Sequence, residues 1–296
     1  MAMPQPGWAG EDEVGGEPTM TPRRPDAAAA AERPRSVRTA ILVGLVLAMV
    51  VLGTLLAGPT AFFALAFVVL LIAQAEFYTV LRADGRHPAV LLGLVSGAVL
   101  LLATYARGAP ALALTVVLPL PLLLVWVLTV PVDSVRSMVV DTYLGIVYGP
   151  FLAAFAALLL REPDGVVLTA TVIGMTAVHD SGGYLVGRKL GRHPMAPRTS
   201  PRKSWEGWIA GTVVVVVLSA IFLPLVHPFD VRLAAVLALV LSVTSPLGDL
   251  AESLVKRDLA VKDMGSLVPG HGGFFDRIDA IIFNAPIAFF VLEWLR

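Results

Sequence analysis

The chain has 296 residues, of which 57% are apolar and only 15% are charged. Soluble domains carry about 25% charged residues, so this composition, with its mean hydropathy of +0.80, predicts an integral membrane protein. The 22 basic and 22 acidic side chains balance, which argues against a globally basic nucleic-acid-binding protein. The absence of cysteine excludes disulfides, thiolate metal sites and cysteine nucleophiles.

Residues 1–37 differ from the rest of the chain because they are rich in proline, glycine, alanine and charge. They contain almost no large aliphatic side chain and cannot bury enough apolar surface to offset the entropy of ordering. We expect a disordered cytosolic tail. A secretory signal is not expected, because no apolar run begins before about residue 40.

Apolar runs dominate the remaining 259 residues or so, and a helix needs about 20 such residues to cross the ~30 Å core of a bilayer. We therefore expect an all-α polytopic membrane protein, with a tight hairpin at Gly58-Pro59 and a broken helix near Pro246 and Gly248. The nine candidate spans are Thr39–Ala57, Thr60–Leu81, Ala89–Tyr105, Ala111–Val130, Met138–Leu160, Val166–Val186, Trp208–Val226, Leu233–Val255 and Ile278–Trp294.

Lysine and arginine gather in alternate loops, and basic loops stay in the cytosol. This bias predicts a multi-pass protein of the cell membrane with a cytosolic N-terminus and an external C-terminus. It also places two polar loops, 187–207 and 256–277, in the cytosol. We expect the helices of 38–165 to form an N-terminal membrane region and 166–296 to form a catalytic region facing the cytosol.

Asp180 lies late in the sixth expected span, where an ionisable side chain is costly and is a functional candidate. Ser181 and the glycines after it would let a ligand approach the backbone. The alternative is that a neighbouring helix or interfacial water satisfies Asp180. His179 is expected to pack or to form a hydrogen bond.

The segment Ser200-Pro201-Arg202-Lys203-Ser204 alternates hydroxyls and cations just before a helix. One interpretation is a basic cytosolic loop without a ligand. The other is a phosphate-binding segment, because hydroxyls, cations and a helix N-terminus all attract phosphate. Ser200 and Lys203 are its candidate ligands, and both interpretations stay open.

Asp249, Ser253 and Lys256 fall on one face of the eighth helix, because each residue advances about 100° around the axis. A glycine-rich turn then leads to Asp276 and Asp279, which share a face of the last helix.

Asp249 and Asp276 together suit Mg²⁺, which usually takes one or two carboxylates plus substrate phosphates. Alternatively, Asp276 and Asp279 cap the last helix and pair with Arg277 and Lys262.

These motifs closely resemble the signature of phosphatidate cytidylyltransferases, the CDP-diacylglycerol synthases. The matching segments are Asp180-Ser181-Gly182, Ser200 to Gly207, Gly248-Asp249-Leu250, Ser253-Leu254-Val255-Lys256-Arg257, Lys262-Asp263 and Pro269-Gly270-His271-Gly272-Gly273-Phe274-Phe275-Asp276-Arg277-Ile278-Asp279. The resemblance implies that CTP and phosphatidate in the bilayer react to give CDP-diacylglycerol and pyrophosphate with Mg²⁺. It also implies a monovalent cation such as K⁺, which we assign to no residue, and a homodimer.

The reaction that the resemblance implies is an in-line attack of the lipid phosphate on the α-phosphorus of CTP, and this attack needs no general base. The expected catalytic residues are Asp249, Lys256, Arg257 and Asp276; the expected metal ligands are Asp249, Asp276 and Asp279; and the expected substrate-binding residues are Asp180, Ser200, Lys203, Ser253, Lys262, His271 and Arg277.

Alternative functions keep the membrane fold but change the chemistry. They are a cytidylyltransferase for ether lipids, a CTP-dependent polyprenol kinase, or a transporter with charges inside its helices. The acyl chains of a lipid substrate are expected in a side opening between helices. Glu76 either lines the polar cavity or is a buried, hydrogen-bonded side chain.

Overall fold

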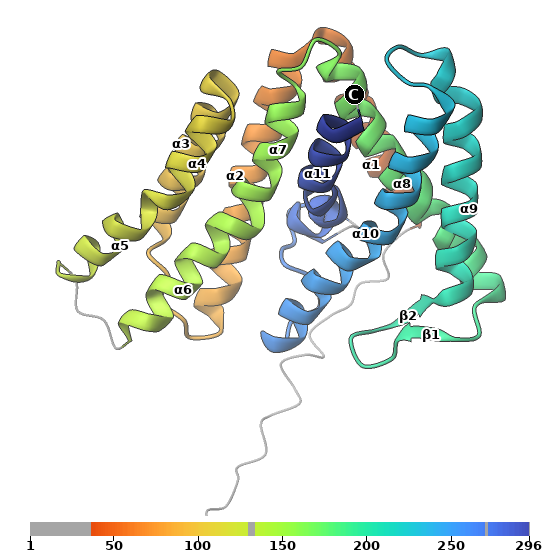
Figure 1. Ribbon diagram of the computed structural model, residues 1–296. Helices are drawn as coiled ribbons and strands as arrows, with labels where there is room; N and C mark the ends of the chain where they lie inside the picture. Colours follow the sequence, from red (N-terminus) through yellow and green to blue (C-terminus); the bar gives the residue numbers. More distant parts are fainter. Residues whose placement is uncertain (1–36, 130–133, 270–271, 296) are drawn as a thin grey trace, which may run out of the picture. The chain divides into compact units, whose positions relative to one another are not determined.

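The computed structural model describes residues 37–129, 134–269 and 272–295, with side chains from Ile41 onward, so the expected N-terminal tail lies outside the described part. The described residues belong to one compact unit of helices with one small hairpin (Figure 1). In chain order the elements are α1 (Val37–Ala57), α2 (Pro59–Ala83), α3 (Val90–Arg107), α4 (Ala109–Val117), α5 (Pro119–Val127), α6 (Val135–Ile146), the π-helical turn η2 (Val147–Phe151), α7 (Leu152–Leu159), α8 (Gly165–Leu190), β1 (Pro194–Ala196), β2 (Ser200–Ser204), α9 (Trp205–Phe222), the 3-10 turn η3 (Leu223–Leu225), α10 (Val231–Asp258) and α11 (Phe275–Leu295).

Helices occupy all nine of the expected spans, with α4 and α5 sharing the fourth and α6, η2 and α7 sharing the fifth. Within the described residues, seven helical segments are long and apolar enough to cross a membrane. The apolar part of α1, Ile41–Ala57, is shorter, and α8 is not among the seven. The protein is therefore a polytopic, predominantly α-helical membrane protein, while the count of nine, the orientation and the division at residue 165 stay predictions.

Local residues explain several of the helix ends. Gly58 joins α1 to α2 with φ 115°, a left-handed conformation that favours glycine, and Pro59 starts α2, where its missing N–H costs nothing. The tight hairpin expected there is confirmed. Ser204 caps α9 by accepting a hydrogen bond from Gly207 N at 3.2 Å.

The polar loop expected over 187–207 is shorter and more ordered than predicted. α8 continues to Leu190, and β1 and β2 then form an antiparallel hairpin. Glu206 at the start of α9 holds this hairpin, because its carboxylate accepts from the backbone N–H groups of Arg192 at 3.1 Å and His193 at 3.2 Å. Figure 1 shows the hairpin at the same end of the helices as the C-terminal end of α10.

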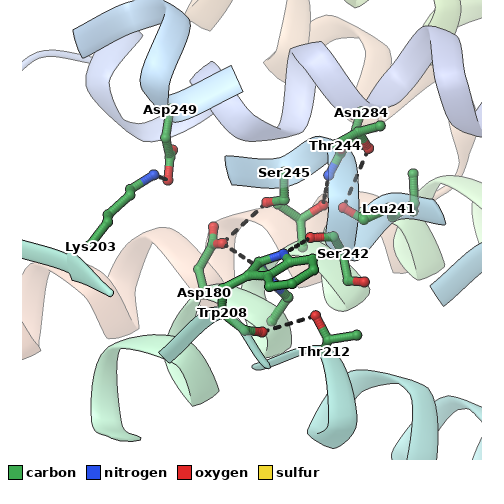
Figure 2. A network of polar contacts seen from close by, with 12 residues as sticks. Asp180, Lys203, Trp208, Thr212, Leu241, Ser242, Thr244, Ser245, Asp249 and Asn284 are labelled. Atoms are coloured by element: carbon green, nitrogen blue, oxygen red, sulfur yellow. Dashed lines mark hydrogen bonds and ion pairs between the residues drawn. The ribbon is translucent and has the colours of Figure 1, made fainter. Parts of the chain in front are cut away.

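The expected break near Pro246 is wrong, because α10 runs without interruption from Val231 to Asp258. Proline cannot donate to the carbonyl four residues earlier, that of Ser242, but Trp208 Nε1 of α9 donates to this oxygen at 2.8 Å (Figure 2). Gly248 serves close packing, since a Cβ there would lie 2.7 Å from Cβ of Phe283 in α11. Both residues therefore belong to a continuous helix that packs tightly against its neighbours.

Helices α8 and α9 approach closely through glycines, as small residues spaced four apart allow in membranes. A Cβ on Gly207 would lie 2.7 Å from the carbonyl oxygen of Gly183, and one on Gly211 would lie 2.5 Å from that of His179. The close contact keeps the polar end of α8 against α9.

The variant Gly211→Ala is expected to lower the melting temperature and the activity, because two backbones must move apart at a cost of about 1–3 kcal/mol. The matched control is Gly174→Ala in α8, whose new Cβ would meet nothing within 4 Å and should be neutral or stabilising. Thermal unfolding in detergent measures both variants. Equal melting temperatures for the two would contradict the packing argument.

Candidate active site

A polar cavity of about 390 Å³ lies between α8, α10 and α11, with β2 contributing one side chain. Its walls hold four aspartates and three cationic side chains, together with hydroxyl and apolar groups. The lining residues are Thr176, Ala177, Asp180, Lys203, Asp249, Ser253, Lys256, Asp276, Arg277, Asp279, Ala280 and Ile281. Such a concentration of charge in a predominantly apolar protein makes this cavity the candidate functional site.

One face of α10 contributes Asp249, Ser253 and Lys256 to this cavity, as the helical spacing predicted. The face is continuous because α10 does not break at Pro246. Glu252 lies on the same face and was not among the residues expected from the sequence. Its position four residues before Lys256 is the spacing of a helical ion pair and would have identified it.

Lys256 of α10 contacts one carboxylate on its own helix, Glu252, and one on α11, Asp276. Its Nζ lies 2.5 Å from Glu252 Oε2 and 3.0 Å from Asp276 Oδ1, and all three side chains are largely buried. A buried cation between two carboxylates holds the helices in register, because removing it would leave the two negative charges uncompensated.

Asp276 organises the loop that precedes α11. Its carboxylate accepts hydrogen bonds from Gly273 N at 2.8 Å and from Met264 N at 2.9 Å, in addition to Lys256. These N–H groups belong to residues that precede α11, so Asp276 holds the loop and does not cap the first turn of the helix; the cation beside its carboxylate is Lys256. These donors occupy most of the lone pairs of Asp276.

Asp249 and Asp279 form the acidic part of the cavity. Asp249 makes an ion pair with Lys203, which ties β2 to α10 (Figure 2). Asp279 is buried and interacts directly with the carboxylates of Asp249 and Glu252. Oxygen Oε1 of Glu252 is buried and has no hydrogen-bond partner among the described residues.

These carboxylates fit a divalent cation. Three neighbouring acids repel one another unless positive charge is supplied, and Lys203 and Lys256 offset only two of them. The buried Oε1 of Glu252 remains without a hydrogen-bond partner in the described structure. Among the described residues no three His, Asp or Glu side chains form a preformed metal-binding group. Mg²⁺ rarely uses such a group and is usually held by one or two carboxylates plus substrate phosphates, so the residues present suit Mg²⁺ that arrives with a nucleotide.

A polar network between α8, α10 and α11 adjoins the cavity (Figure 2). Asp180 Oδ1 accepts from Ser245 Oγ at 3.1 Å and lies 3.1 Å from His179 Nδ1. Asn284 donates to Thr176 Oγ1 at 2.9 Å and accepts from Thr244 Oγ1 at 2.6 Å. Asp180 is thus partly satisfied by neighbours and also lines the cavity, and its role in substrate binding stays a prediction.

The polar partners in this network were missed in the sequence, although Asn284 inside an apolar run was a usable signal.

Glu76 of α2 holds the start of α11 from outside the cavity. Its Oε2 accepts from Phe274 N at 2.7 Å and from Phe275 N at 3.2 Å, so the hydrogen-bonded interpretation is correct. The glycines of the loop make room for it, because a Cβ on Gly265 or Gly273 would lie 2.2 Å or 2.6 Å from its carboxylate.

Residues 38–295 match the profile of the cytidylyltransferase family. The chain belongs to this family. The protein is therefore an enzyme of the nucleotidyltransferase class, and the cavity with its acids and cations is the candidate active site of a membrane-embedded cytidylyltransferase.

Several similar proteins are named phosphatidate cytidylyltransferases, and two of them match this chain over nearly their whole length. The chain is 33% identical to a phosphatidate cytidylyltransferase of Mycobacterium bovis over 97% of the chain and 98% of the relative. It is also 33% identical to one of Mycobacterium tuberculosis, over 97% of the chain and 92% of the relative. A Bacillus subtilis phosphatidate cytidylyltransferase is 43% identical over 38% of the chain and 42% of the relative.

The polar cavity contains all but four of the site residues expected from the sequence. Arg257 lies outside its walls, and its Nε donates at 3.4 Å to the carbonyl of Thr199 in the hairpin. Ser200 in β2 and Lys262 in the loop before α11 are not among the lining residues either. His271 lies outside the described residues. The substrate contacts expected of these four residues stay predictions.

Proposed function

We propose that the protein is a phosphatidate cytidylyltransferase that makes CDP-diacylglycerol from CTP and phosphatidate. The observation that carries the proposal is the acidic and cationic cavity among the helices of a membrane protein, in a chain of the cytidylyltransferase family. The names of the full-length mycobacterial relatives support phosphatidate as the acceptor. The excess of lysine and arginine in alternate loops supports a cavity that faces the cytosol, where CTP is available.

The reaction is a substitution at phosphorus. A phosphate oxygen of phosphatidate attacks the α-phosphorus of CTP, the bond to the β-phosphate oxygen breaks, and pyrophosphate leaves with the bonding electron pair. The nucleophile is a phosphomonoester with a second pKa near 6, so it is largely deprotonated at neutral pH. No general base is required, and catalysis consists of positioning and charge neutralisation.

The lysines and arginine of the cavity bring two polyanions together. Lys203 and Arg277 lie in the wall and can contact phosphate oxygens, while Lys256 is held in place by Glu252 and Asp276. Ser253 adds a hydroxyl on the same face of α10. Fixed cations of this kind stabilise the charge that grows on the leaving pyrophosphate.

Asp249 and Asp279 are the residues best placed to hold Mg²⁺, with Glu252 beside them. Asp276, which the sequence also suggested as a ligand, mainly positions the loop and Lys256 because donors already occupy its oxygens. Bound Mg²⁺ would supply charge neutralisation for the triphosphate. The need for K⁺ and the homodimer rest on the family resemblance alone and stay predictions.

The test uses the purified full-length protein in detergent with CTP, Mg²⁺ and one acceptor at a time. We expect CDP-diacylglycerol by mass spectrometry, with one pyrophosphate per molecule, when phosphatidate is the acceptor. A clear preference for an ether-linked lipid phosphate would show that the acceptor is an ether lipid and not phosphatidate. Phosphorylation of a polyprenol, or transport of substrate in vesicles without CTP consumption, would refute the proposed function.

A further inference from the structure

A second cavity, of about 150 Å³, lies between α2, α7, α8 and α11 and is lined almost wholly by apolar side chains. Thr169 is the one polar residue in its wall as far as the chain is described. A cavity of this size and lining holds a small hydrocarbon such as benzene and excludes water. It therefore suits a short stretch of aliphatic chain and not a polar ligand.

The apolar cavity adjoins the polar one. Ile281 of α11 lines both. On α8, Thr176 and Ala177 face the polar cavity, while Val172 and Ile173, one turn earlier, face the apolar cavity. Along α8 and α11 the lining therefore changes from charged to apolar side chains. A phospholipid changes in the same order from its head group to its tail.

The depth of the apolar cavity matches the position of an acyl chain. Asp180 lines the polar cavity, while Ile173 and Thr169, which line the apolar one, come seven and eleven residues earlier in α8, or about 10 Å and 16 Å along the helix. Half of a ~30 Å bilayer core is about 15 Å. A lipid with its phosphate near Asp180 would place the middle and the distal part of a tail in this cavity.

Helix α1 closes one side of the apolar cavity through Val51 and packs against α2 and α8. Leu55 is the one buried residue of its described side chains, and most of the others are exposed. Helix α1 is therefore the wall of the apolar cavity that has the least surface buried against the rest of the protein.

We propose that the apolar cavity binds one acyl chain of the lipid phosphate whose head group occupies the polar cavity, and that Ile281 separates the two. The proposal rests on the proposed function for the identity of the lipid. It makes the lining of α7 and α11 the determinant of acyl-chain preference, because one methylene more or less in an apolar pocket changes selectivity about 10-fold or more.

The direct test is photo-cross-linking without nucleotide, using phosphatidate that carries a diazirine in the middle of one acyl chain. We expect labelled peptides from Phe62–Leu70 and Ile278–Ala285. Excess unlabelled phosphatidate should remove this labelling, and phosphatidylcholine with the same chains should not. Labelling confined to other segments, or equal competition by both lipids, would overturn the proposal. Because no turnover is needed, this result is independent of whether CDP-diacylglycerol is made.

A variant provides a second measurement. Ala157→Phe in α7 fills the apolar cavity, and Val213→Phe on the exposed face of α9 is the matched control. Ala157→Phe should raise KM for long-chain phosphatidate about tenfold and leave KM for CTP and the rate with dihexanoyl phosphatidate unchanged. The control should change none of these values. Equal losses with long and short chains would contradict an acyl site.

Discussion

The variant Lys256→Gln is expected to lower the rate of CDP-diacylglycerol formation by a factor of about 100 or more, whereas Arg257→Gln should cost less than about tenfold. The two residues are neighbours and both were expected to be catalytic, yet the structure separates them. Lys256 lines the cavity between Glu252 and Asp276, while Arg257 contacts the carbonyl of Thr199 outside the cavity. Initial rates with saturating CTP and phosphatidate measure the difference.

The loss in Lys256→Gln must be separated from unfolding, because two buried carboxylates without their cation cost about 3–5 kcal/mol of stability. The double variant Glu252→Gln with Lys256→Gln removes one of these carboxylates along with the cation. It should recover much of the melting temperature but none of the turnover. Recovery of activity together with stability would show that Lys256 acts only as a structural ion pair. Comparable rates for the Lys256 and Arg257 single variants would contradict the assignment of the cavity.

The helices were predictable because each apolar run is long and bounded by polar or glycine-rich segments. The face shared by Asp249, Ser253 and Lys256 was predictable for a similar reason, since helical geometry is local. The absence of Arg257 from the cavity was not predictable in this way, because it lies about 40° around the helix from Ser253. Its contact with the carbonyl of Thr199 in the hairpin is a tertiary one.

Features that depend on distant partners were not predictable from local patterns. Pro246 indicated a break, but the indole of Trp208 from another helix satisfies the carbonyl that proline leaves free. The β1–β2 hairpin depends on Glu206, which binds the backbone of Arg192 and His193 across the loop. No local sequence pattern predicts such tertiary hydrogen bonds, and they override the intrinsic secondary-structure preference of a segment.

The variant Glu76→Ala is expected to lower the turnover number about 100-fold, although Glu76 does not line the cavity. Its carboxylate accepts the N–H groups of Phe274 and Phe275 at the start of α11. Its neighbour Phe77 stacks on Phe275 with ring centroids 5.6 Å apart. Helix α2 therefore fixes the start of the helix that carries Asp276, and a shift of about 1 Å at a reacting centre can cost about 100-fold in rate.

Glu76 is a positioning residue by this argument, and the amide protons that it binds give a readout separate from rate. Loss of two hydrogen bonds to a carboxylate should cost about 3 kcal/mol of local stability, so hydrogen exchange at Phe274 and Phe275 should accelerate by a factor of about 100 in Glu76→Ala. Glu76→Gln keeps one acceptor oxygen and should lie between wild type and Glu76→Ala in both rate and exchange. The control Glu293→Ala, at the exposed far end of α11, should change neither. Slow turnover with unchanged exchange at Phe274 and Phe275 would contradict this argument, because the two hydrogen bonds by which Glu76 holds the start of α11 would then not be the cause of the loss.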